Sequence, residues 1–99
     1  MSKPMRPRIR LEIRRERLLE KALELSTTKQ YCTLTMRQLA DADGCGKTML
    51  YRAVGNKQEV QQAIELYALE KGPGHPAALV VLRQMAAMGD QRAIEVIGF

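Results

Sequence analysis

The chain has no tryptophan and few other aromatic residues, with three tyrosines and one phenylalanine among 99 residues. Its core must therefore be built mainly from Leu, Ile, Val, Met and Ala, and such cores suit helices better than sheets. The length allows one small domain, or one domain with a short appendage. We therefore expect an all-α fold, a small helical bundle.

Cysteine and histidine are also scarce, with Cys32, Cys45 and His75 as the only members. Their number and spacing do not form a zinc site. His75 lies in a Gly/Pro-rich boundary where a linker role is expected, and Cys45 is expected in the core. No catalytic set is visible, so we predict no enzyme activity, no metal and no cofactor.

A long apolar run is missing as well. The chain starts with the basic segment MSKPMRPRIR, and no apolar stretch follows it. The sequence therefore predicts neither a signal peptide nor a membrane span, and no membrane partner. We expect a cytoplasmic protein with reduced thiols.

Positive charge is concentrated at the N-terminus. Residues 1–17 hold seven of the sixteen lysines and arginines but only two of the eleven acidic residues, which leaves nine of each sign elsewhere. Lys and Arg neutralise phosphates and release condensed counterions. A basic arm ahead of a neutral domain therefore favours double-stranded DNA as partner, with a solubilising tail as the alternative.

Residues 1–9 contain two prolines and are predicted as the basic arm. Residues 10–71 are predicted as the DNA-binding domain, and its first helix should span about residues 10–28 with Leu11, Leu18, Ala22 and Leu25 on one face. Thr35 should cap a second short helix that Gly44 ends. Further helices are predicted over 47–54 and 58–71.

The sequence GPGHP at residues 72–76 predicts a linker. Residues 77–99 then indicate two more helices, a short C-terminal hairpin in which Gly89 closes the first helix and Asp90 caps the second. The segment ALVVLRQMAAM is too apolar for an exposed helix. It should pack on the first and fourth helices, form a dimer interface, or do both.

Gly46-Lys47-Thr48 resembles the end of a nucleotide-binding phosphate loop. That loop needs a glycine five positions before the second glycine, and Asp41 stands there. It should also follow a buried strand, whereas a helical pattern precedes it here. A short helix, a turn with Gly44 and another short helix instead indicate a helix-turn-helix, with Lys47 and Thr48 opening its second helix.

These features resemble the DNA-binding domain of the tetracycline-repressor (TetR) family. The resemblance covers residues 14–64, about half of the chain, and includes LTMRQLA, the spacing from Gly44 to Tyr51, and Gly55-Asn56-Lys57. Ser26 and Gln30 depart from the family pattern, which usually has an aromatic residue and a glycine there. The family's large C-terminal ligand domain has no room in the 28 residues after Lys71, so we do not expect a small-molecule effector.

The resemblance and the predicted positions together give a set of DNA contacts. By resemblance, Tyr51 and Lys57 meet phosphates, and Arg37 reaches a base or a phosphate. By position, Thr35 caps a helix beside a phosphate, while Lys47, Thr48, Met49 and Arg52 face the groove. The arm could enter the minor groove or follow the backbone through Arg6, Arg8 and Arg10.

One helix-turn-helix reads only a few base pairs, so a homodimer on a palindrome is expected. The sequence thus predicts a dimeric, sequence-specific transcriptional repressor. A small viral DNA-packaging or replication subunit that oligomerises through its C-terminal helices is the alternative. An interaction module without DNA binding is a third reading, against which the basic residues argue.

Overall fold

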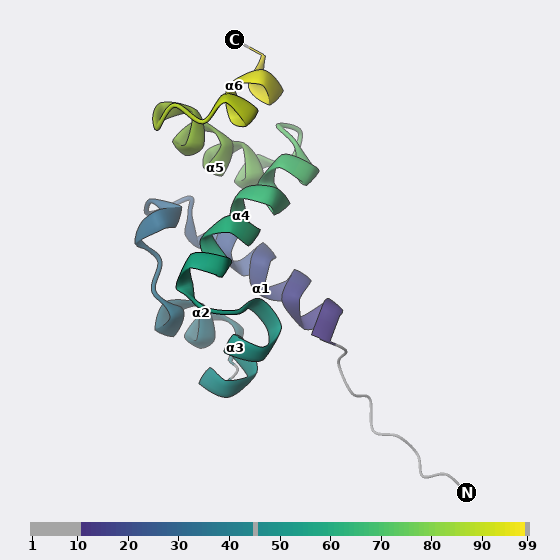
Figure 1. Cartoon of the computed structure of the whole chain (residues 1–99), viewed down its shortest axis with the longest axis vertical. Coiled ribbons are helices and arrows are strands. Elements are labelled where there is room, and N and C mark those ends of the chain that lie inside the picture. Colours follow the sequence, from purple (N-terminus) through teal and green to yellow (C-terminus); the bar gives the residue numbers. More distant parts are fainter. Residues whose placement is uncertain (1–10, 45, 99) are drawn as a thin grey trace, which may run out of the picture.

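The computed structural model describes residues 11–44 and 46–98, and its regular structure is helical throughout, as predicted (Figure 1). The helices are α1 (Leu11–Leu25), α2 (Met36–Asp43), α3 (Lys47–Val54), α4 (Lys57–Lys71), α5 (Pro76–Ala87) and α6 (Gln91–Ile97), with a 3-10 turn η1 (Tyr31–Thr33) before α2. None of them is long and apolar enough to cross a membrane. The arm at residues 1–9, together with Arg10 and Cys45, lies outside the described residues.

The first helix ends at Leu25, three residues before the predicted end. The reason is the hydroxyl-rich segment that follows. Thr27 Oγ1 donates to the carbonyl of Glu24 at 2.7 Å, and Thr28 Oγ1 donates to that of Leu25 at 3.0 Å. Such side chains take over the last helical carbonyls and stop the helix. The turn η1, which the sequence did not indicate, then leads into α2.

The second helix begins after Thr35 and ends at Gly44, and α3 spans residues 47–54, as predicted. The Thr35 hydroxyl accepts the N–H of Gln38 at 3.0 Å, and Gln38 Oε1 accepts the N–H of Thr35 at 2.8 Å. This reciprocal capping box fixes the start of α2. Gly44 ends the helix with φ +74°, a left-handed conformation that glycine adopts without a Cβ clash. The short connection that follows brings α3 into contact with α2.

The start of α4 has the same kind of cap. Asn56 and Glu59 exchange two hydrogen bonds of 2.9 Å, which begins the helix at Lys57 rather than at residue 58 as predicted. Gly55 is required immediately before this cap. Its φ is +87°, and a Cβ there would lie 2.3 Å from Glu59 Oε1. A side chain at position 55 would therefore displace the Glu59 carboxylate from its capping hydrogen bond.

The core is organised around the middle of α1. Leu18, Ala22 and Leu23 are fully buried, and α1 contacts α2, α3, α4 and α5. The predicted inward position of Leu11 is wrong, because Leu11 lies in the first turn and is 44% exposed. Leu11 lies on the same face of α1 as Leu18, as the helical repeat predicted. However, this end of α1 extends beyond the helices that cover its middle.

The fifth helix packs within the same chain. Ala78, Val81, Leu82 and Met85 are fully buried, and α5 contacts α1, α4 and α6. Gln84 adds two hydrogen bonds to the connection after α1: its Nε2 donates to the Ser26 carbonyl at 3.0 Å, and its Oε1 accepts the Tyr31 N–H at 2.8 Å. The apolar side of α5 thus completes the core around α1 and α4.

His75 has a structural role beyond the linker role that the sequence suggested. Its Nδ1 accepts the N–H of Ala78 at 3.2 Å and caps α5, which begins at Pro76 inside the predicted linker. Its Nε2 lies 3.0 Å from Glu20 Oε2 on α1. A neutral ring with its proton on Nε2 satisfies both contacts, so His75 joins the start of α5 to α1.

A second polar network joins η1, α4 and α6. The Tyr31 hydroxyl donates to Glu65 Oε2 at 2.6 Å, and Arg92 Nη2 donates to Glu65 Oε1 at 3.0 Å. Arg92 also pairs with Asp90, which caps α6 by accepting the Arg92 N–H at 3.0 Å. The hydrogen bond from the Arg92 side chain holds the pKa of Asp90 below its usual value.

We predict that Gly55→Ala destabilises the fold by about 2 kcal/mol or more, because it forces an unfavourable backbone angle and displaces the α4 cap. Thermal unfolding should show a clearly lower Tm. Gly74→Ala is the matched control, since nothing lies within 4 Å of a Cβ built there. Equal Tm values for the two variants would contradict this role of Gly55.

We also predict that the Asp90 contribution to stability disappears in acid. The folded pKa of Asp90 is lowered, so its contribution is present above the unfolded pKa of about 3.9 and is lost as pH falls through the folded pKa. Asp90→Asn keeps a capping side chain and removes the charge, at a cost of up to about 1 kcal/mol near pH 7. Urea titrations should show that the difference in unfolding free energy between the wild type and Asp90→Asn shrinks between pH 5 and pH 2. A difference that stays constant over this range would contradict the role of the Asp90 charge.

Candidate nucleic-acid interface

One side of α3 exposes four of the predicted DNA-contacting residues. Successive helical residues are about 100° apart, so positions 47, 48, 51 and 52 share a face. All four side chains are exposed, whereas the opposite side buries Leu50, Ala53 and Val54. We call the exposed side the α3 face, made of Lys47, Thr48, Tyr51 and Arg52. It carries two cations and two hydroxyl groups.

The N-terminus of α3 differs from those of its neighbours. Side chains cap α2 and α4, but the residue before α3 is Gly46, which has no side chain to accept the first N–H groups. Lys47 is the first helical residue, where the helix dipole disfavours a positive charge. An anion at this end would satisfy both the N–H groups and Lys47.

Thr35 and Arg37 lie at the start of α2. Thr35 is exposed, but its N–H and hydroxyl oxygen are both engaged in the capping box, which leaves the hydroxyl proton to donate. The Arg37 side chain is 88% exposed and lies 4.0 Å from Asp41, whose side chain is 76% exposed. An ion pair of this kind is weak, so Arg37 can turn toward another anion.

Lys57 and Met49 flank the α3 face. Lys57 is exposed at the first position of α4, again at the helix end that disfavours a cation. Met49 is partly buried beside the face. No hydrogen bond or ion pair among the described residues joins Thr35, Arg37 or Lys57 to the α3 face. The predicted contacts Arg6, Arg8 and Arg10 lie outside the described residues.

A buried ion pair connects α1 to the end of α2. The Asp43 side chain is fully buried, and Arg14 Nη1 donates to its Oδ2 at 2.7 Å. Arg17 Nη2 lies 3.2 Å from Oδ1, but without hydrogen-bond geometry. Asp43 directly precedes the Gly44 turn. This pair therefore fixes α1 against the connection that leads into α3.

A groove of about 420 Å³ lies at the C-terminal end of α3. Its charged and polar walls are Arg15 from α1, Tyr51 and Arg52 from α3, and Glu59 and Gln62 from α4. We call it the basic groove. Two residues of the α3 face thus also line a cavity to which α1 contributes an arginine.

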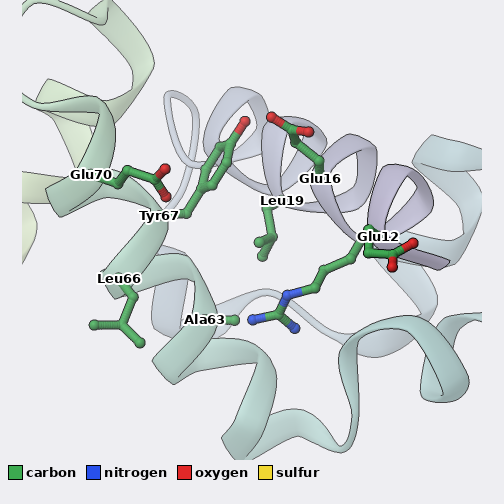
Figure 2. A pocket seen from close by; sticks show the side chains of 8 residues that line it. Glu12, Glu16, Leu19, Ala63, Leu66, Tyr67 and Glu70 are labelled. Carbon is green, nitrogen blue, oxygen red and sulfur yellow. The ribbon is translucent and has the colours of Figure 1, made fainter. Parts of the chain in front are cut away.

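A second groove, of about 390 Å³, follows α1 and α4 on the other side of Arg15. Figure 2 shows its side chains, with Glu12, Glu16 and Leu19 on one helix and Tyr67 and Glu70 on the other. We call it the acidic groove. Burial, together with the nearby Glu20 and Glu16 carboxylates, raises the pKa of Tyr67 to about 12. Tyr67 is therefore a neutral donor, and its hydroxyl bonds to Glu20 at 3.3 Å.

Two features of this surface were not predicted from the sequence. The first is the ion pair of Asp43. A carboxylate is unfavourable at the C-terminal end of a helix, so its presence there could have indicated a nearby cation. Arg14 and Arg17, three positions apart on one face of α1, were the candidates. The second is Arg15, whose place in the basic groove depends on how α1 crosses α3 and α4. No group of His, Cys, Asp and Glu suited to a metal occurs in residues 11–44 and 46–98.

We predict that Arg14→Met destabilises the protein far more than Arg17→Met. Both variants keep the aliphatic stem and lose the charge. Arg14 is 18% exposed and hydrogen-bonds the buried carboxylate, so its loss should cost about 3 kcal/mol. Arg17 is 45% exposed and not aligned, and its loss should cost less than about 1 kcal/mol. Urea unfolding measures both, and equal losses would contradict the assignment.

The chain gives no match to a family model, to a curated protein or to a solved structure. The family resemblance therefore rests on the residue pattern alone.

Proposed function

We propose that this protein is a sequence-specific DNA-binding protein, a dimeric transcriptional repressor that reads a palindromic site. In this proposal, α2 and α3 form the helix-turn-helix and α3 enters the major groove. The observation that carries the proposal is the α3 face. It gathers Lys47, Thr48, Tyr51 and Arg52 on the solvent side of one short helix, and the core holds the other side.

The electrostatics around α3 support a phosphate-rich partner. Lys47 and Lys57 both stand at helix N-termini, where a cation costs stability unless an anion is bound. DNA supplies such an anion at regular intervals along each strand. Phosphate contacts from Lys57, Tyr51 and Thr35 would set the register of the protein on the duplex. Such contacts carry no sequence information.

Sequence choice would then come from the first turns of α3. Lys47 and Arg52 can donate to guanine O6 and N7, and Thr48 can bond either base edge. Met49, partly buried at the edge of the face, offers an apolar contact for a thymine methyl. These are the side chain types that read a major groove, and no catalytic step or cofactor enters the proposal.

The dimer would use the end of the molecule that carries α5 and α6. These helices lie at the opposite end from α3 in Figure 1. Among the described residues at this end, the exposed large apolar side chains are Met88 at 57% and Val96 at 38%. A contact at this end leaves the α3 face open in both copies. Cytoplasmic localisation follows from the proposed role on DNA.

The test is selection of binding sites from random DNA, with the oligomer mass measured in parallel. We expect recovery of a palindrome and a dimer mass. Recovery of no preferred sequence at moderate salt would overturn the repressor proposal. A large ring with non-specific binding would instead favour the packaging or replication subunit.

We predict that the double variant Lys47→Ala plus Arg52→Ala loses the sequence preference and keeps the fold. The selected site should lose at least about thirtyfold in affinity, because each of the two base contacts contributes about 1–3 kcal/mol. Fluorescence anisotropy with selected and scrambled duplexes measures this, and circular dichroism checks the fold.

The matched control is Lys29→Ala plus Arg83→Ala, which removes the same charge from exposed positions outside the α3 face. It should weaken binding to both duplexes equally and slightly. If the Lys47 and Arg52 variant keeps the preference of the wild type, α3 is not the recognition helix.

A further inference from the structure

The basic groove brings together groups from α3, from the next helix α4, and from α1, which is far from both in the sequence. Arg15 comes from the first turns of α1, Tyr51 and Arg52 from α3, and Gln62 from α4. Guanidinium groups and a phenolic hydroxyl are donors that suit phosphate oxygens. The groove is open to solvent, so an extended ligand can reach it without a change of fold.

Arg15 is in a different situation from its neighbours on α1. Arg14 and Arg17 are engaged with the buried carboxylate of Asp43, at 2.7 Å and 3.2 Å. Within the described part of the chain, Arg15 forms no ion pair with any carboxylate at up to 4.0 Å. The helix therefore presents Arg15 to solvent, between Arg14, which hydrogen-bonds Asp43, and Arg17, which lies near the same carboxylate.

The carboxylate in the basic groove is already engaged. Glu59 Oε1 accepts the N–H of Asn56 at 2.9 Å, and Asn56 accepts the N–H of Glu59 in return. This capping box holds Glu59 at the start of α4. The groove thus keeps two guanidinium groups against one carboxylate that is fixed by a backbone bond, and its balance favours an anion.

Tyr51 and Arg52 belong both to the α3 face and to the basic groove. A DNA strand that follows the α3 face toward the C-terminal end of α3 therefore arrives at Arg15. We propose that the basic groove binds a backbone phosphate of the DNA and that Arg15 is a positioning residue that reads no base. This inference rests on the proposed function and adds α1 to the DNA-contacting surface.

The acidic groove sets the limit of this contact. It shares Arg15, Ala63 and Leu66 with the basic groove, but its other charged walls are Glu12, Glu16 and Glu70 (Figure 2). A polyanion is repelled from these carboxylates. Arg15 thus marks the boundary at which the DNA backbone leaves the protein, and α1 contributes a contact on one side only.

The experiment measures the affinity for the selected duplex and for a scrambled duplex between 50 and 200 mM salt. Arg15→Gln removes the charge and keeps a polar side chain of similar length. Each phosphate contact contributes about one unit to the slope of log K against log salt. We expect the slope of this variant to become less steep by about one unit. Its affinity should fall about tenfold on both duplexes.

Two further variants give the comparison. Arg83→Gln removes one charge from the exposed surface of α5, at the end of the molecule away from α3 (Figure 1), and should leave the slope nearly unchanged. Arg15→Lys restores the charge and should restore the slope. The preference for the selected sequence should be the same in all three variants, since Arg15 reads no base.

Each outcome bears on one proposal or on both. If Arg15→Gln and Arg83→Gln have the same slope and affinity, the phosphate site at Arg15 is overturned while the DNA-binding function stands. If Arg15→Gln loses the sequence preference, Arg15 is a base-reading residue and the positioning role is overturned. If the wild-type protein binds neither duplex at low salt, the proposed function fails and the phosphate site fails with it.

Discussion

Burial of the middle of α1 is the constraint on which the rest of the structure depends. Leu18, Ala22 and Leu23 are fully enclosed by other helices, and α1 contacts α2, α3, α4 and α5. With no tryptophan and one phenylalanine, the chain forms its core mainly from aliphatic side chains, to which Tyr31 and Tyr67 are added. A shift of α1 would therefore move α3 and α5 together, and the orientation of the α3 face depends on this packing.

Charge on α1 has two separate uses at adjacent positions. Arg14 hydrogen-bonds the buried Asp43 and holds the connection before α3, whereas Arg15 points into an open groove beside that helix. The difference comes from helical geometry alone, since neighbouring residues are about 100° apart. A buried ion pair adds less stability than an apolar contact of equal size, so specificity of the α1 to α2 arrangement is the role that best explains the Arg14 pair.

Local patterns predicted the helix boundaries well, because caps and glycines act over a few residues. Thr35, Gly44 and Asp90 end or begin helices where the sequence placed them. What the sequence could not predict depends on how helices cross. The periodic position of Leu11 indicated burial, yet Leu11 is exposed among the described residues whereas Leu18 is fully buried. The hydrogen bonds of Gln84, to residues 53 and 58 positions away, and the exposure of Arg15 are likewise properties of the tertiary packing.

The packing of α5 links the two halves of the proposed function. Ala78, Val81, Leu82 and Met85 are buried within the chain, and among the described residues at that end the exposed large apolar side chains are Met88 and Val96. In the proposed complex, a palindrome would strengthen the dimer contact, because it holds two copies side by side. DNA binding and dimerisation would then support each other, because the second copy binds beside the first at a high effective concentration.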